Sequence, residues 1–343
     1  MNHSYFIPLL IFLYGLLTSV QAQFTDTTRF IAEDGYIEKI KTNFGIKFSL
    51  DNAYETFRVD TEFNDYSIYP NITNVLQFSL SYRFIRASIG WAPDWLPGNR
   101  DEDIKGKTDA LGISVAMFSR HWYQGLGYGK VQGYYLENTR DYDPTWMDGD
   151  PYIQLPDLHY MGFSGTTGYV LNPRLSLKSV SLQTERQLKS AGSFIAFAAY
   201  RYFIIDDKSI PSPGGATQKS NNLEIGIGPG YVYTFVLKER FYASLGFMPS
   251  IGLVNTKLTT RYADGDVISN QRNLAFRWAG HGAIGYNGHS FFTGFYINYA
   301  GMTYEQENTT AVNHDNRMFY QFFAGFRVRS PKWLNRFFDN MGF

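Results

Sequence analysis

Alternation of apolar and polar residues, without long apolar runs, is the feature that most constrains this chain. It is clearest over residues 223–235, where alternate positions carry Leu223, Ile225, Ile227, Tyr231, Tyr233 and Phe235. Between them stand Glu224, Gly226, Gly228, Gly230, Val232 and Thr234. Because successive side chains of a strand point to opposite faces, this segment has one apolar face and one small or polar face.

The first 22 residues have the form of a secretory signal. An apolar stretch runs from Tyr5 to Leu17, and Val20-Gln21-Ala22 is a small-residue cleavage site. Pro8 and the short apolar length argue against an uncleaved anchor helix. We expect cleavage before Gln23, and export to the cell outer membrane of a chain whose later segments repeat the alternating pattern.

Composition excludes several classes of protein. The chain has no Cys, so disulfides and thiolate metal sites are excluded. Its 31 basic and 31 acidic residues balance, and no basic stripe points to nucleic acid. Mean hydropathy is −0.27, and no apolar stretch of helix-spanning length follows the signal. The 26 Tyr, 29 Phe and 6 Trp fit either the core of a soluble β-sandwich or the outside of a lipid-facing barrel.

Strand length distinguishes a soluble β-sandwich from a lipid-facing barrel. Tilted membrane strands need about 9–11 residues, whereas strands of soluble proteins usually have about 5–6. Several alternating segments here are long, such as Phe241 to Leu253 and Leu274 to Tyr286. We predict twelve strands, near 44–50, 75–82, 85–92, 109–118, 122–136, 174–186, 193–204, 222–236, 241–254, 273–286, 290–304 and 318–329. An even number places both ends of the barrel domain on the periplasmic side.

The connections between these strands alternate in length, as in outer-membrane barrels. The short ones, predicted to be periplasmic turns, are Arg83-Phe84, Ser119 to His121, Gln187 to Gly192, Leu237 to Arg240 and Asn287 to His289. The long ones, predicted to be extracellular loops, are Asp51 to Asn74, Pro93 to Thr108, Glu137 to Pro173, Ile205 to Asn221, Asn255 to Arg272 and Glu305 to Arg317.

The predicted fold is therefore all-β, an antiparallel transmembrane β-barrel of about 12 strands, with 10–14 as the range. We expect a signal peptide over 1–22, a periplasmic N-terminal segment over 23–43, the barrel over 44–329 and a C-terminal tail over 330–343. Leu158 to Leu171 could add two strands; we place it in the third loop or in a hairpin inside the lumen. Glycines 125, 127, 129 and 133 predict a bulge or the close approach of an inserted loop.

Charged side chains within the strands should point into the lumen, because a charge on the lipid face costs about 2–4 kcal/mol at midplane. The inward set is Lys47, Arg86, Arg201, Glu224, Arg277, His281, Gln321 and Arg327. These side chains could line a pore or a ligand site. They could equally be the paired polar filling that any small barrel needs.

Other motifs carry weaker signals. The acidic third loop, with Glu137, Asp141, Asp143, Asp148, Asp150 and Asp157, could bind Ca²⁺, but Thr145 interrupts the EF-hand spacing and a solvated loop is the simpler interpretation. Gly106-Lys107-Thr108 is not a P-loop, because position 101 is Asp and a strand follows. We expect no metal and no cofactor.

A lipid hydrolase needs a Ser nucleophile with a base within hydrogen-bond reach. The histidines beyond the signal are His121, His159, His281, His289 and His314, and His289-Ser290 lies in a predicted turn. The His-x-Ser-Asn-Gly arrangement of twelve-stranded phospholipases is missing. We therefore predict that the chain is not an enzyme.

Several short segments resemble a known family. In order they are Ile68-Tyr69-Pro70-Asn71, Ser81-Tyr82-Arg83, Gly106-Lys107-Thr108, Gln183 to Gln187 and Lys189-Ser190-Ala191-Gly192-Ser193. Over residues 30–329 the chain resembles domain of unknown function family 4421, whose members are secreted proteins of Gram-negative bacteria regarded as outer-membrane barrels. The resemblance implies location and fold but brings no activity.

The predicted positions of these motifs in the barrel explain the motif residues without any catalytic role. Ser190, Ala191, Gly192 and Ser193 sit at a predicted periplasmic turn, where small residues allow tight geometry. Tyr82 suits an aromatic girdle and Arg83 the headgroup region. Pro70, Asn71 and Gly106-Lys107-Thr108 fall in predicted extracellular loops, where binding is possible.

The sequence thus predicts a non-enzymatic outer-membrane barrel that acts as a channel, a ligand-binding protein or a structural envelope protein. The alternatives are a lipid-active outer-membrane enzyme and a soluble periplasmic β-protein. Expected partners are outer-membrane lipid, the barrel assembly machinery during biogenesis and a small-molecule ligand of unknown identity, with no nucleic acid.

Overall fold

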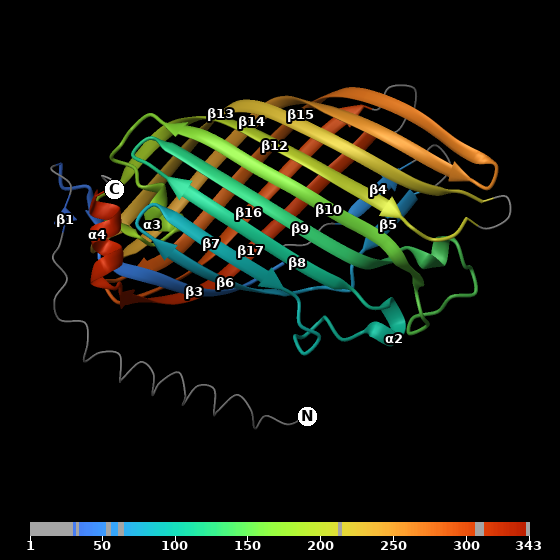
Figure 1. The fold of residues 1–343 in the computed structure, drawn as a ribbon, viewed down its shortest axis with the longest axis horizontal. Coiled ribbons are helices and arrows are strands. Elements are labelled where there is room, and N and C mark those ends of the chain that lie inside the picture. The colour runs from blue at the N-terminus through green and yellow to red at the C-terminus, as the bar shows by residue number, and fades with distance from the viewer. Residues whose placement is uncertain are drawn as a thin grey trace.

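Twelve antiparallel strands close into a barrel in the computed structural model, which describes residues 30–31, 34–52, 56–60, 65–211, 215–305 and 312–340 (Figure 1). The wall strands are β3 (Asn43–Asp51), β6 (Val75–Tyr82), β7 (Ile85–Trp91), β8 (Asp109–Phe118), β9 (Trp122–Leu136), β10 (Ile153–Val170), β12 (Ala191–Asp207), β13 (Thr217–Leu237), β14 (Phe241–Tyr262), β15 (Gly265–Asn287), β16 (Phe291–Glu305) and β17 (Val312–Arg329). Pairing of β17 with β3 closes the ring. The predicted fold class is confirmed, whereas the predicted signal peptide lies outside the described residues.

The remaining elements gather at the two ends of the barrel. The end where β3 begins and β17 stops, here called the terminal end, carries β1 (Phe30–Ile31), β2 (Ile37–Lys39), α3 (Leu177–Ser181), β11 (Glu185–Gln187) and α4 (Lys332–Asn340). The opposite end, here called the loop end, carries β4 (Phe57–Asp60), β5 (Asp65–Tyr69), α2 (Glu102–Lys105) and the 3₁₀ turn at Thr139–Asp141. Both ends of the barrel domain therefore lie at the same end, as predicted.

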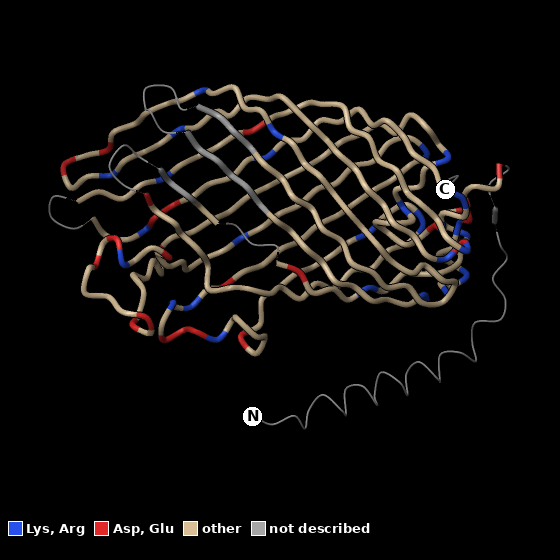
Figure 2. The backbone as a smooth tube through the Cα atoms, turned by 180° about the vertical axis from the view of Figure 1, so that it is seen from behind, with Lys and Arg blue, Asp and Glu red and all other residues tan. Residues whose placement is uncertain are grey.

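The wall has an apolar outside and a more polar inside. On β13, Leu223, Ile225 and Ile227 are exposed, the last at 64 %, whereas the intervening Glu224 is 4 % exposed. Figure 2 shows that charged residues are sparse along the middle of the wall. An outside of this kind is suited to hydrocarbon, since a charge there would be costly. Among the described helices, none is long and apolar enough to cross a membrane.

One predicted wall strand is wrong. Residues 174–186 do not enter the wall, because they form α3 and the start of β11 inside the terminal end. The wall position belongs to β10, which pairs with β9 and β12. It includes residues 158–170, so the prediction of a third-loop segment or a hairpin inside the lumen is wrong. The exchange preserves the even number of strands, so the count of twelve holds while one member changes.

The apolar signal of β10 is weak because neighbouring strands supply part of its outer surface. Gly165 is paired with Tyr200 of β12, and a Cβ built on Gly165 would lie 2.2 Å from the Tyr200 ring. On the same face, Thr167 donates a hydrogen bond to Gln124, whose amide donates to the Tyr200 hydroxyl at 2.8 Å. Gly165 and Thr167 therefore face outward while the Tyr200 ring covers the glycine and the Thr167 hydroxyl keeps a hydrogen-bond partner.

Replacing Gly165 with Val tests this arrangement. Because the new side chain would overlap the Tyr200 ring, we expect the free energy of unfolding to fall by about 1–3 kcal/mol, as in other overpacked sites. Urea titration of the refolded barrel, followed by heat-modifiable migration on a gel, measures the change. The double variant Gly165→Val/Tyr200→Ala should recover part of the loss, and a fully stable single variant would contradict the covering role of Tyr200.

Several predicted loops are shorter than expected because strand pairing continues beyond the apolar belt. The segment predicted as the loop Asn255 to Arg272 mostly extends β14 and β15, which stay paired up to Tyr262 and Gly265. Part of Ile205 to Asn221 likewise belongs to β12 and β13. The predicted strand ends follow the apolar alternation, whereas the backbone pairing of the strands continues beyond it.

The predicted irregularity in β9 is present at Gly133. Its φ is +85°, and a Cβ there would lie 2.0 Å from the Lys107 carbonyl oxygen. Opposite this position the pairing of β9 with β10 shifts register between Leu155 and His159. A bulge and the close approach of a loop therefore both account for this glycine.

Candidate functional site

The terminal end of the lumen is filled by the long connection between β10 and β12. This connection, residues 171–190 with α3 and β11, is here called the plug. Its β11 pairs with β2, so that part of the N-terminal segment lies in the same small sheet. Figure 1 shows α3 at the terminal end, and its hydrogen bonds from the inward-facing Arg86 and Asn287 place it within the ring of strands. Gln187 to Gly192, predicted as a short turn, thus comprises the end of a twenty-residue segment and the first two residues of β12.

Arg327 of β17 holds the plug from one side of the wall. Its guanidinium, in a residue 1 % exposed, donates to the Gln183 carbonyl at 2.5 and 3.0 Å and to the Asn287 side chain at 2.6 Å. Asn287 in turn donates to the carbonyls of Ser179 and Glu185 at 2.9 and 3.1 Å. A planar group with five donors can satisfy several carbonyls that would otherwise be buried without a partner.

A second buried cluster joins the plug to the N-terminal segment. Arg186 forms an ion pair with Glu38 and donates to the Asn287 and Glu239 carbonyls at 2.9 and 2.7 Å. The Nε2 atom of His289 lies 2.8 Å from Arg186 and 3.3 Å from Glu38. The carboxylate compensates the buried guanidinium charge, which would be very costly alone.

The other side of the plug is apolar. Leu175 is buried in a cluster with Val170, Ala191, Ile195 and Val232, which belong to β10, β12 and β13. Further wall contacts come from β6, whose Ser81 donates to the Leu182 carbonyl at 2.8 Å, and from β7, whose Arg86 donates to the Ser181 carbonyl at 2.8 Å. The plug is therefore fastened to the wall on nearly all sides.

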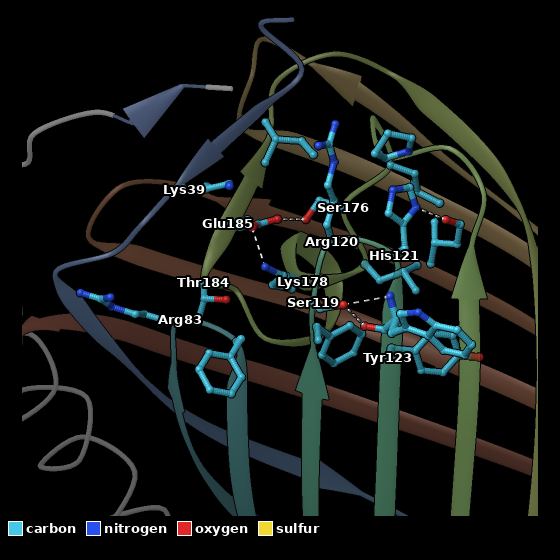
Figure 3. Close-up of a pocket in the computed structure, with 18 of the residues that line it drawn as sticks. Lys39, Arg83, Ser119, Arg120, His121, Tyr123, Ser176, Lys178, Thr184 and Glu185 are labelled. Atoms are coloured by element: carbon cyan, nitrogen blue, oxygen red, sulfur yellow. Dashed lines mark hydrogen bonds and ion pairs between the residues drawn. The ribbon is translucent and has the colours of Figure 1, made fainter. Parts of the chain in front are cut away.

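On the remaining side a cavity of about 760 Å³ separates the plug from β8 and β9 (Figure 3). Its floor includes Phe118 and Tyr123, which point inward and stack with ring centroids 5.9 Å apart. The plug contributes Leu175, Lys178 and Glu185. The cavity is large enough for a small ligand.

The two faces of the β2–β11 sheet separate this cavity from the buried ion cluster. Lys39 and Glu185 are directly paired and share the face that lines the cavity. Glu38 and Arg186, also paired, share the opposite face, towards His289. Because side chains alternate between the two faces of β2 and β11, Lys39 and Glu185 face the cavity. Glu38 and Arg186 face the other way and fasten the plug.

The eight residues predicted to line the lumen all lie on the inner side of the wall, but they fall into separate groups. Arg86 and Arg327 hold the plug. Lys47 and Gln321 lie 3.4 Å apart on β3 and β17, and Gln321 donates to Asp51 at 3.2 Å. The His281 ring stacks on Tyr296 with centroids 6.0 Å apart. A role for any of them in conduction stays a prediction.

A charged group stands in the middle of the lumen. Glu224 of β13 forms an ion pair with Arg277 of β15 at 2.5 Å. Arg201 is the direct partner of Glu224 on β12, and its guanidinium lies 4.1 Å from the centroid of the Phe203 ring. The Glu224 carboxylate therefore has an ion-pair partner on β15 and a second arginine opposite it in the register with β12, which fits the polar filling of a small barrel.

The family-like motif positions at the loop end fasten loops to the wall. The main-chain nitrogen of Asn71 donates to the Thr108 hydroxyl at 2.9 Å, and the side-chain amide of Asn71 donates to the Gly106 carbonyl at 2.8 Å. Thr108 itself donates to the Gly133 carbonyl at 2.7 Å. The buried Pro70 precedes this contact, and Lys107 provides the carbonyl that approaches Gly133.

The motif positions at the terminal end also have structural contacts. Tyr82 donates to Asn335 of α4 at 2.5 Å, and Arg83 pairs with Asp339 at 2.8 Å. Ser190 accepts from the Val236 amide and Ser193 from the Asn172 amide, both at 2.9 Å. Ala191 is buried, and a Cβ on Gly192 would lie 2.5 Å from the Tyr231 hydroxyl.

The loop end has its own internal packing. Phe57 of β4 lies against Tyr134 and Tyr160, with ring centroids 5.5 and 5.9 Å away, in a cluster that includes Phe203. In the acidic connection beyond β9, Thr145 donates to Asp143 from its amide and its hydroxyl, which lowers the pKa of that carboxyl. Within the described residues, no group of three or more metal-binding side chains is close enough to hold an ion.

Sequence reasoning did not identify the residues that fasten the plug, although Gln183 to Gln187 was one of the family-like segments. Glu38, Glu185, Arg186, Asn287 and His289 were not among the predicted site residues. One signal could have revealed them: as a wall strand, 174–186 would put Gln183 and Glu185 on the same face as Leu175 and Leu177. A lipid-facing surface does not accept a carboxylate readily.

The chain belongs to the family of the domain of unknown function DUF4421, whose model matches residues 26–328. No curated protein matches it. Among solved structures it is similar to OmpT, an outer membrane protein of Vibrio cholerae, with a TM-score of 0.34 and 7 % identity over 88 % of this chain and 100 % of that one. It is also similar to the outer membrane protease OmpT of Escherichia coli, with a TM-score of 0.34 and 9 % identity over 89 % and 99 %. Likenesses of this degree carry no inference about activity.

Proposed function

We propose that this chain is a non-enzymatic outer-membrane protein whose barrel is closed at the periplasmic end by the plug, and that it binds a ligand there rather than conducting solutes freely. The observation that carries the proposal is the fastening of residues 171–190 inside the wall. Arg327, Asn287 and Arg86 hold its main-chain carbonyls on one side, and Leu175 packs against the opposite side. A segment held in this way obstructs the lumen.

The assignment of the terminal end to the periplasm rests on the pattern of the connections. Outer-membrane barrels carry short turns at the periplasmic end. Four of the five connections between wall strands at the terminal end are short, namely 83–84, 119–121, 238–240 and 288–290. The plug is the exception, and the export signal predicted at residues 1–22 is consistent with this topology.

The environments of His121 and His289 support a non-catalytic role over the lipid-active enzyme. His289 lies between Glu38 and Arg186, in contacts that fasten the plug. The Nδ1 atom of His121 is 2.8 Å from the Val170 carbonyl, and its ring stacks on Tyr169. Both rings have structural partners.

A single introduced thiol tests closure, because the chain has no Cys of its own. Ser244 lies on the inner face of β14, three residues from the start of that strand at the terminal end, and is 1 % exposed. We expect Ser244→Cys to react with a charged thiol reagent about a hundredfold faster once residues 174–187 are replaced by a short Gly-Ser linker, as for removal of about 3 kcal/mol of protection. Lys238→Cys, in an exposed turn at the same end, should react equally in both backgrounds.

Planar-bilayer recordings give an independent measurement. The intact barrel should show no steady conductance steps. Steady steps from the intact protein, or a Ser244→Cys thiol that reacts as quickly as Lys238→Cys with the plug in place, would overturn the proposal.

A further inference from the structure

The cavity beside the plug is both large and amphiphilic. Its volume of about 760 Å³ falls within the range typical of small-molecule sites. The inward-facing rings of Phe118 and Tyr123 and the buried Leu175 give it an apolar floor. An apolar floor with a few polar groups at the edge is the usual construction of such sites.

The charge around the opening is positive. The two acidic side chains that line the cavity have cationic partners: Glu185 pairs with Lys178 at 2.8 Å, and Asp34 pairs with Arg174 at 3.4 Å. Lys39 and Arg120 are exposed and lie on different sides of the opening, one on β2 and the other in the turn between β8 and β9 (Figure 3). A ligand between them would meet two further cations.

The wider surroundings reinforce this potential. Lys and Arg gather at the terminal end, whereas Asp and Glu are frequent in the connections at the loop end (Figure 2). The terminal-end segments 34–42, 83–84, 119–121, 171–190, 237–240, 288–290 and 329–340 hold thirteen Lys and Arg against five Asp and Glu. A low-dielectric cleft surrounded by one sign of charge raises the local concentration of ligands of the opposite sign.

We propose that the cavity binds an amphiphilic anion, with a phosphate or carboxylate head between Lys39 and Arg120 and a short apolar chain over Phe118 and Tyr123. This inference rests on the proposed plugged barrel, since the plug forms one side of the cavity. The two can fail separately, because thiol protection reports on the plug and ligand titration reports on the cavity.

Calorimetric titration of the full mature barrel in nanodiscs tests the inference, with hexyl phosphate as the probe and empty nanodiscs as the blank. We expect saturable binding that Lys39→Gln/Arg120→Gln weakens about tenfold or more, since charge-assisted contacts to an anion are among the stronger ones. The matched control is Lys238→Gln/Arg240→Gln, which removes the same charge from an exposed turn at the same end and should leave affinity unchanged.

Three comparisons separate the parts of the proposal. Hexanol should not bind saturably, and inorganic phosphate should bind more weakly than hexyl phosphate. Phe118→Ala should weaken hexyl phosphate but not inorganic phosphate. Competition by phosphatidic acid added to the nanodisc would identify a membrane lipid as the source of the ligand. If phosphatidic acid does not compete, the ligand is a periplasmic solute.

Several results would overturn the inference. They are absence of saturable binding to the intact barrel, equal affinity for hexanol or for inorganic phosphate, and equal weakening by the control pair of substitutions. Binding of hexyl phosphate that persists unchanged after replacement of residues 174–187 would also place the ligand elsewhere.

Discussion

Replacing Arg327 with Met is expected to lower the free energy of unfolding by about 3 kcal/mol or more, because several buried acceptors lose their donor at once. The guanidinium serves the Gln183 carbonyl and the Asn287 side chain, and it also contacts the Gly288 and His289 carbonyls. Methionine fills much of the same volume, so the loss reflects hydrogen bonding rather than a cavity. Urea titration followed by gel migration measures the change.

The matched control is Arg329→Met, on the same strand but at an exposed position. Its effect should be within about 0.5 kcal/mol, as for ordinary surface substitutions. Arg327→Lys should recover only part of the stability, since an ammonium cannot reproduce the planar fork. If Arg327→Met also fails to speed the reaction of the Ser244→Cys thiol, Arg327 does not hold the plug in place.

Replacing Glu224 with Gln is expected to cost about 1–3 kcal/mol, because two guanidiniums would then share the middle of the lumen without the carboxylate. Glu224 is buried, pairs with Arg277 at 2.5 Å and stands opposite Arg201 in the strand register. The Arg277 side chain is 30 % exposed, so water partly screens its ion pair with Glu224. We therefore expect the loss in the free energy of unfolding to lie near the lower end of this range.

A double-mutant cycle isolates the interaction between Glu224 and Arg277. Glu224→Gln/Arg277→Gln should destabilise the barrel by less than the sum of the single changes, since the second removes a charge that the first leaves unpaired. Additive single effects would show that the pair does not interact in the folded barrel. In a barrel opened by removal of the plug, Glu224→Gln should raise and Arg277→Gln should lower the preference for anions.

Much of the wall could be predicted because the signal for it is local. Strands 75–82, 109–118 and 122–136 were placed with the bounds that the structure gives. In these segments a side chain that points to lipid must be apolar, so the pattern is repeated at every second position. The same argument placed Arg201, Glu224 and Arg277 inside, where the structure has them.

The plug could not be predicted in this way. Residues 174–186 carry alternating Leu175 and Leu177 as a strand would, yet these side chains pack against the inner wall. Conversely β10 presents Gly165 and Thr167 among its outward residues, and the Tyr200 ring of the next strand covers Gly165. Both misassignments come from contacts between segments that a local pattern does not contain.

The sequence by itself determined a barrel and the inward direction of its charged side chains, because apolar alternation depends only on the covalent order of residues and on the solvent outside. Only the tertiary structure decided which of two neighbouring segments enters the wall and what closes the lumen. Those outcomes depend on contacts between residues far apart in the sequence. Arg327 donates a hydrogen bond to the carbonyl of Gln183, and Arg186 forms an ion pair with Glu38. Buried polar groups accept any partner of suitable geometry, so their pairing is selected by the closed fold and not by spacing along the chain.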